Sequence, residues 1–197
     1  MKHLIDHARS FPQLAARRPE EWSRLAEGQS PHALFITCSD SRVIPSLITG
    51  ARPGELFELR TAGNIVPRHG GSRPAGEAAT IEYAVEVLGV ADIVVCGHSH
   101  CGAVGAMLRG EDLTAVPAVR DWLGHATPLP DGTDSTAPDI AEAVQSHVLD
   151  QLDRLRGYPC VAARLADGRL GLHGWFYEIH TGSVLAHQPH ADAFRAL

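Results

Sequence analysis

Two short apolar runs in this sequence each lead into residues that bind metals. Residues 33–37 (ALFIT) run directly into Cys38, and residues 91–96 (ADIVVC) run into Gly97 and His98. Runs of four to six residues that are rich in Ile, Val and Phe are typical of buried parallel strands. Open α/β sheets bind ligands beyond the carboxyl ends of their strands, so the two runs predict a site at one edge of a sheet.

The rest of the pattern alternates strand and helix. Residues 54–60 (GELFELR) indicate a third strand, and residues 75–88 carry apolar side chains at helical spacing. We expect further helices at 102–109 and 140–156, a hairpin at 170–179 and 183–187, and a surface loop at 128–138. The alternation predicts an α/β fold with a central, mostly parallel sheet flanked by helices.

Length and charge narrow the classes of protein. A length of 197 residues favours one domain, and a formal charge of −6 without a dense Lys/Arg cluster argues against a nucleic-acid partner. No apolar run reaches the ~18 residues that span a bilayer, so we expect no membrane partner and a cytoplasmic location. Four cysteines are too few for a disulfide scaffold, and we expect thiols or thiolates.

Three residues at the two strand ends form a candidate metal site. Cys38 and His98 gain a third potential ligand in Cys101, at the start of an expected helix. Zinc prefers sulfur and imidazole ligands, and three protein ligands with an open fourth position are typical of catalytic zinc. His-x-x-Cys also occurs by chance, and Cys38 alone is compatible with a buried thiol. Cys96 and Cys160 have no partner pattern and are expected to pack.

Asp40 and Arg42 follow Cys38 at alternating positions of one loop. The carboxylate has two mutually exclusive roles: it coordinates zinc as a fourth ligand, or it pairs with Arg42 and accepts a hydrogen bond from a zinc-bound water. In the second case zinc lowers the pKa of that water to ~7 and yields hydroxide at neutral pH. The alternative without a function is a plain loop salt bridge, which contributes little when exposed.

These motifs resemble those of the β-class carbonic anhydrases. The resemblance rests on CSDSR at 38–42 and GHSHCG at 97–102, and it extends through PGELF at 53–57, GNIVP at 63–67, IEYAV at 81–85 and GWFY at 174–177. It implies one zinc-enzyme domain over 1–197, with an N-terminal helical arm (1–28) that packs on a partner subunit and a C-terminal hairpin strand.

The resemblance also implies a function and its residues. A member of this family is a carbonic anhydrase, which reversibly hydrates CO2 to bicarbonate and a proton through a zinc-bound hydroxide. One Zn2+ per chain is then held by Cys38, His98 and Cys101. Asp40 and Arg42 match the dyad that orients the hydroxide.

Four further residues match substrate-binding positions of the family. Gln29 matches a glutamine of the plant-like branch, and the Gly102 N–H is a candidate for holding a bicarbonate oxygen. Phe57 and Tyr83 match aromatic residues that line the cleft from across a dimer interface, which implies a homodimer or a higher even-numbered homo-oligomer. The residues alone favour simple core aromatics for Phe57 and Tyr83 and a solvated loop residue for Gln29, and only the resemblance assigns them to the site.

This chain departs from one branch of the family at Phe35, and its zinc site is compatible with two other functions. The branch with an inhibitory bicarbonate site has Trp where this chain has Phe35, beside an Arg and a Tyr that match Arg60 and Tyr177, so we expect no such site here. The same zinc site also suits a hydrolase of carbonyl sulfide or carbon disulfide, which are linear like CO2. A non-catalytic zinc protein in which Asp40 closes the site is the alternative from another class.

Overall fold

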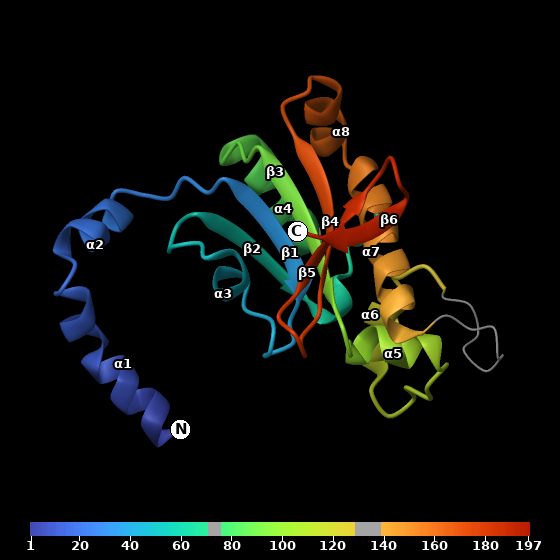
Figure 1. Ribbon diagram of the computed structural model, residues 1–197, viewed down its shortest axis with the longest axis horizontal. Helices are drawn as coiled ribbons and strands as arrows, with labels where there is room; N and C mark the ends of the chain where they lie inside the picture. The colour runs from blue at the N-terminus through green and yellow to red at the C-terminus, as the bar shows by residue number, and fades with distance from the viewer. Residues whose placement is uncertain (71–75, 129–138) are drawn as a thin grey trace.

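A computed structural model of the chain describes residues 1–70, 76–128 and 139–197 (Figure 1). The surface loop expected at 128–138 lies outside these residues from 129 onward. Within the described part of the chain, no helix combines the length and the apolar character that crossing a membrane requires.

A six-stranded sheet in the order β2-β1-β3-β4-β5-β6 forms the centre of the fold. The strands are β1 (Ala33–Cys38), β2 (Leu56–Thr61), β3 (Asp92–His98), β4 (Gly171–Tyr177), β5 (Val184–Gln188) and β6 (Ala193–Ala196). The first four strands in this order pair in parallel, and β5 and β6 add on in antiparallel fashion. The predicted strands and the mostly parallel sheet are confirmed, whereas β6 was not predicted, because only four partly exposed residues form it.

Helices surround the sheet and form the N-terminal arm. They are α1 (Lys2–Ala15), α2 (Pro19–Ala26), α3 (Pro45–Thr49), α4 (Gly76–Glu82), α5 (Gly102–Leu108), α6 (Pro117–Leu123), α7 (Ile140–Arg156) and α8 (Pro159–Ala166). The helix predicted at 140–156 is confirmed as α7. It begins after Asp139, whose carboxylate accepts hydrogen bonds from the backbone N–H groups of Ala141 and Glu142 and so caps the first turn.

The helix predicted over 75–88 differs from the prediction in its second half. After α4 the chain forms a π-helical turn over Tyr83–Val87. In this turn the Leu88 N–H donates to the Tyr83 carbonyl at 3.0 Å, five residues back. A single widened turn leaves the apolar residues on nearly the same face, so apolar spacing does not reveal it.

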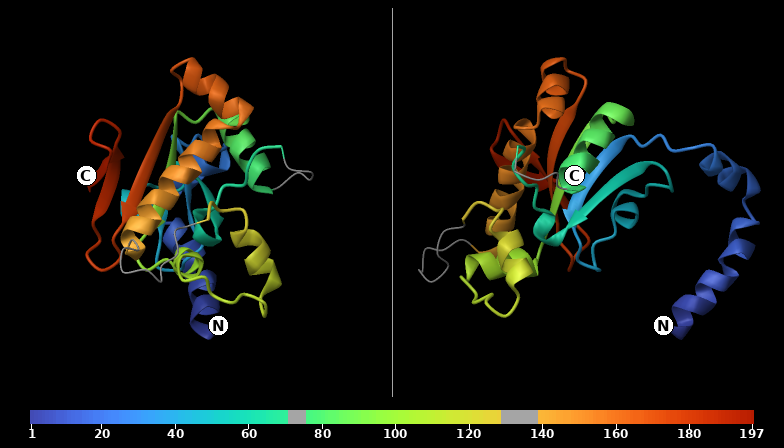
Figure 2. Two further views of the ribbon diagram at one scale, coloured as in Figure 1. Left: turned by 90° about the vertical axis from the view of Figure 1, so that its right-hand side faces the viewer. Right: turned by 180° about the vertical axis from the view of Figure 1, so that it is seen from behind.

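The main core lies between one face of the sheet and helices α4, α7 and α8 (Figure 2). Alternate strand residues such as Ile36 and Val95 pack there against Val148 and Leu152 of α7. A smaller cluster on the opposite face contains Phe35, whose ring meets Trp175 edge to face at 5.8 Å. Figures 1 and 2 show the arm of α1 and α2 standing away from this body, and neither helix buries a residue.

Helix α7 packs closely on β3 at Gly97. A Cβ atom at this residue would lie 2.5 Å from Cγ1 of Val144 and 2.8 Å from Cγ2 of Val148. Real Cβ atoms do not approach other atoms so closely, so α7 packs directly on the β3 backbone. This contact fixes the helix beside the residue that precedes His98.

Candidate metal centre

The loop that follows β1, residues 38–43, is held by an arginine from the neighbouring strand. Nη2 of Arg60 donates to the carbonyl oxygens of Cys38 at 3.0 Å, of Asp40 at 2.9 Å and of Val43 at 2.7 Å. The Ser39 N–H donates to the Thr61 carbonyl at 3.0 Å, which extends the β1–β2 pairing by one bond. The loop therefore turns at the carboxyl edge of the sheet.

The loop that follows β3, residues 98–101, is held by its own serine. Ser99 Oγ donates to Oε1 of Glu178 at 2.6 Å and accepts from the Ile179 N–H at 3.0 Å. His100 has a φ of 55°, in the left-handed region that few non-glycine residues adopt. This turn directs the chain into α5, where Cys101 is the N-cap residue.

The two loops bring Cys38, His98 and Cys101 into one buried group. One ligand atom from each residue lies within 4.8 Å of the others. Nδ1 of His98 lies 2.9 Å from the Ser99 carbonyl, whereas its buried Nε2 has no hydrogen-bond partner among the described residues. With the ring proton on Nδ1, Nε2 keeps a lone pair for a metal. Two sulfurs and an imidazole fit zinc.

The two cysteines of this group have pKa values that are shifted in opposite directions. A hydrogen bond from the Cys101 thiol lowers the pKa of Cys38 from 9.0 to about 4. The same pairing, together with burial, raises the pKa of Cys101. The lowered pKa favours the thiolate form of Cys38, which is the form in which cysteine binds a metal.

Asp40 lies beside the donor group but is held by Arg42. Nε of Arg42 donates to Oδ1 at 2.9 Å and Nη2 donates to Oδ2 at 2.7 Å, while the Arg42 backbone N–H donates to Oδ1 at 2.9 Å. These bonds hold the pKa of the Asp40 carboxyl well below its usual range. Its Oδ2 lies 3.9 Å from Nε2 of His98. Nη2 of Arg42 also donates to the His100 carbonyl at 3.2 Å and so joins the two loops.

The other predicted site residues lie in two places. Gly102 is the first residue of α5 and directly follows Cys101. Phe57 and Tyr83 lie against each other, with ring centroids 5.9 Å apart, and Phe57 pairs in register with Leu34, far from the carboxyl end of β1. Gln29 is exposed and precedes the amino end of that strand. Within one chain, the structure does not bring these last three to the metal group.

The residues that hold the two loops were not predicted from the sequence in this role. Arg60, Ser99 and Glu178 bind backbone or side-chain atoms of the loops, and the Gly63 N–H donates to the Cys38 sulfur at 3.4 Å. Each lies within three residues of a strand end, which is the signal that marks them. Cys96 packs with the Phe35 cluster, and burial raises its pKa to about 12, so it is not part of the donor group.

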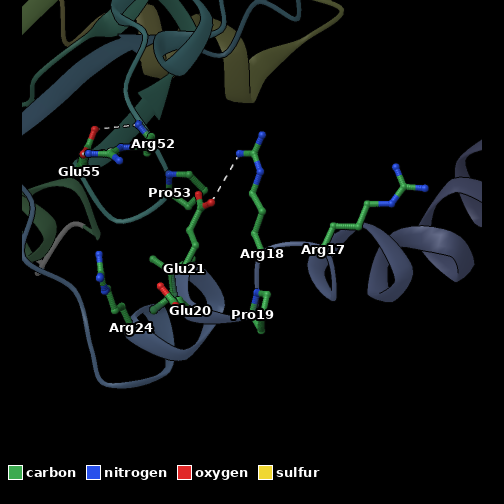
Figure 3. Close-up of a pocket in the computed structure, with 10 residues that line it drawn as sticks. Arg17, Arg18, Pro19, Glu20, Glu21, Arg24, Arg52, Pro53 and Glu55 are labelled. Atoms are coloured by element: carbon green, nitrogen blue, oxygen red, sulfur yellow. Dashed lines mark hydrogen bonds and ion pairs between the residues drawn. The ribbon is translucent and has the colours of Figure 1, made fainter.

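A separate cavity of about 530 Å³ lies between α2 and the segment before β2 (Figure 3). Its charged side chains include two ion pairs, Arg18 with Glu21 at 3.5 Å and Arg52 with Glu55 at 3.1 Å. None of the predicted site residues lines it. It is a cleft between the arm and the body, distinct from the metal group.

Three comparisons with known proteins agree. Residues 33–184 match the family model described as carbonic anhydrase. A carbonic anhydrase of Pseudomonas aeruginosa is 48% identical over 191 residues, which cover 93% of this chain and 86% of that protein. The β-carbonic anhydrase CcaA has a TM-score of 0.91 at 39% identity, covering 100% of this chain and 99% of that one. A structure from work on two tetrameric β-carbonic anhydrases of Sordaria macrospora has a TM-score of 0.78 at 31% identity, covering 94% of each chain.

Proposed function

The chain belongs to the β-carbonic anhydrase family and is a zinc-dependent carbonic anhydrase, and from this we propose how its residues divide the reversible hydration of CO2. The observation that carries the proposal is the donor group of Cys38, His98 and Cys101 beside a carboxylate held by Arg42. These three residues would hold one Zn2+, which supplies a Lewis acid and lowers the pKa of a bound water to about 7.

Asp40 orients the attacking water in this proposal. Arg42 occupies one side of both carboxylate oxygens, and the remaining lone pairs accept a hydrogen bond from the water. Because the pKa of Asp40 lies well below its usual range, this carboxylate stays ionised and does not keep the proton that the water loses. That proton passes to solvent buffer, and Asp40 acts by positioning.

Residues from two subunits complete the substrate pocket. The Gly102 N–H, beside Cys101, would hold a bicarbonate oxygen of its own subunit's site. Gln29, Phe57 and Tyr83 lie toward the other end of the strands, so we assign them to the site of a partner, with Gln29 as the active-site glutamine of the plant-like branch.

The N-terminal arm, residues 1–28, would hold that partner. Its first helix, α1, exposes the apolar side chains of Leu4, Ile5, Phe11 and Leu14 and buries nothing on its own subunit. An uncovered amphipathic helix of this kind needs another surface to pack on. We therefore propose a homodimer, or a higher even-numbered assembly such as the tetramers of Sordaria macrospora. A cytoplasmic location stays a prediction.

Stopped-flow CO2 hydration tests the chemistry. Zinc-loaded protein should accelerate hydration between pH 7 and 9, and Cys38→Ser should lose both zinc and activity. Cys160→Ser, which alters a cysteine outside the donor group, is the matched control and should keep both. Asp40→Asn should keep zinc but lose about 100-fold in rate, the order of loss expected when a reacting group is misoriented. A wild-type rate equal to that of buffer would contradict the proposal.

The same assay addresses the alternatives. Sulfide release from carbonyl sulfide or carbon disulfide, measured beside CO2 hydration, ranks the three linear substrates. A permanently closed, non-catalytic site is disfavoured because Arg42 holds both oxygens of Asp40. If Asp40 nevertheless remained bound to the metal at pH 8.5, the closed site would be correct.

Subunit mixing tests the shared pocket. Cys38→Ser lacks a ligand, and Gln29→Ala lacks only an exposed side chain of the linker before β1. When the two inactive proteins are unfolded together and refolded, mixed dimers contain one site with all its residues intact. Activity should therefore return, whereas residues acting within one subunit would leave the mixture inactive. Solution mass gives the assembly, and removal of residues 1–28 should dissociate it.

A further inference from the structure

We propose that His147, buried in the middle of α7, is a positioning residue for the metal centre, acting through Gly63 on the ligand Cys38. Nε2 of His147 lies 2.8 Å from the Gly63 carbonyl, and the N–H of the same glycine donates to the Cys38 sulfur at 3.4 Å. One backbone residue thus receives a bond from the helix and gives one to the ligand. The inference rests on the proposed zinc site and deepens it.

A row of buried polar side chains on α7 holds the segment after β2. Besides His147, Gln151 accepts from the Val66 N–H at 2.9 Å, and Arg154 donates to the Val66 carbonyl at 3.1 Å. The three residues are spaced by four and three positions and therefore share one helix face. Buried polar groups are costly unless they are paired, so this row indicates that the segment's backbone groups need fixed partners.

The hydrogen bonds of His147 indicate a neutral ring with its single proton on Nε2. To bond the Gly63 carbonyl, Nε2 must carry the ring proton, which leaves Nδ1 as an acceptor 3.4 Å from Nε2 of Gln151. Burial lowers the pKa of His147, so the neutral ring persists. The Gln151 amide also donates to the His147 carbonyl at 3.2 Å, which fixes both side chains on the helix.

Gly63 can transmit the position of His147 to Cys38 because its own backbone has little freedom to move. It adopts φ 70° and ψ 22°, a left-handed conformation that favours glycine. A Cβ there would lie 3.0 Å from the Ala103 Cβ, so the backbone fits tightly against α5. With its carbonyl held by His147, the Gly63 N–H points at the sulfur of Cys38. Bonds of this kind orient a ligand and stabilise its charge, and their loss typically weakens metal binding by about 10- to 100-fold.

Zinc affinity, measured by competition with a chelator, tests the inference. His147→Leu removes the donor and should weaken zinc binding by about 10- to 100-fold. His147→Gln places an amide N–H near the position of Nε2 and should restore most of the affinity. Leu152→Ala, a truncation in the buried core on the same helix, is the control: it should lower stability in denaturant but leave zinc affinity within about threefold, because the bonds of His147 to Gly63 and Gln151 remain.

A spectroscopic readout separates positioning from general support. In Co2+-loaded protein, the sulfur-to-cobalt charge-transfer band should shift in His147→Leu and return in His147→Gln. His147→Asn, whose amide is too short to reach the Gly63 carbonyl, repeats the test should the leucine variant not fold. Unchanged affinity and an unchanged band in a folded donor-free variant would overturn the inference. If the band shifts in His147→Leu but the wild-type protein does not hydrate CO2, the role of His147 stands and only the proposed function is contradicted.

Discussion

The two loops that carry the ligands are held in opposite ways. The 38–43 loop is anchored from outside, since Arg60 of β2 binds three of its carbonyl groups. The 98–101 loop is anchored mainly from within, by the side chain of its own Ser99 and the left-handed backbone of His100, and Arg42 adds one bond to the His100 carbonyl.

The difference follows from what each loop must present. The first loop offers one ligand and the pair of Asp40 and Arg42, to which we assign a role in catalysis, and its backbone is anchored by a residue of another strand. The second loop offers ligands at both of its ends, so its intervening side chains are available to fasten it. External anchoring therefore accompanies the side chains that we propose to act in catalysis, and internal anchoring accompanies ligands alone.

Removal of the external anchor is the largest test of this comparison. Arg60→Met keeps the length of the side chain but leaves three carbonyl groups without a charged donor. We expect the free energy of unfolding to fall by about 2 kcal/mol and CO2 hydration to fall with it, measured by denaturant titration and stopped flow. Arg52→Met, which removes an exposed ion pair with Glu55, should cost less than about 0.5 kcal/mol. Equal effects of the two changes would refute external anchoring.

The internal anchor, Ser99, can be tested against Ser39, which occupies the matching position of the other loop. Ser99 and Ser39 each follow the first ligand of a loop, but Ser39 is exposed and makes no side-chain hydrogen bond to another described residue. Ser99→Ala removes the hydroxyl that donates to Glu178 and accepts from the Ile179 N–H, and it should lower the free energy of unfolding by about 1 kcal/mol. Ser39→Ala should be near neutral in the same titration. A reversed order would mean that the loops are held alike.

Acidification tests the carboxylate that Ser99 binds. The Ser99 hydroxyl holds the pKa of Glu178 below its ordinary 4.5. The stabilisation is therefore fully present above pH 4.5 and disappears as the pH falls through the lowered pKa of the folded state. Glu178→Gln should unfold more easily than wild type at pH 7, and the gap should narrow below pH 4.5. If the difference in stability between the two proteins instead widened in acid, the pKa of Glu178 would be raised and not lowered in the folded state.

The smallest effect is expected at His100. An L-residue in the left-handed region is strained, and glycine is not, although glycine loses more chain entropy on folding. His100→Gly should therefore raise the free energy of unfolding by up to about 0.5 kcal/mol. Ser41→Gly in the first loop relieves no such strain and should lower it by about 0.5 kcal/mol. Thermal unfolding of both variants measures the difference.

The elements with strong local patterns were predictable from sequence. The apolar runs before Cys38 and His98 gave the strands and placed the ligands, and the residues of α7 gave its bounds. The short helices α3, α6 and α8 were not predicted, since five to eight residues hold too few turns for a periodic signal.

The anchoring of the site was not predictable in the same way. Arg60 and Glu178 act on atoms 17 to 22 and 79 positions away, and His147 acts on Gly63 from 84 positions away. No spacing rule links such residues, because the pairing arises only when the sheet and α7 come together. In the proposed assembly, the position of Gln29, Phe57 and Tyr83 relative to a metal depends on a second subunit.

The close contact at Gly97 makes this position less tolerant of substitution than a residue outside the metal site would ordinarily be. A larger residue there would push α7 off β3, and α7 carries His147, which holds the backbone behind Cys38. In a screen of random variants, a change at this position would register as a zinc-binding defect, although residue 97 offers no ligand. Position 97 would then tolerate few substitutions, because the contact with α7 leaves no space for a side chain.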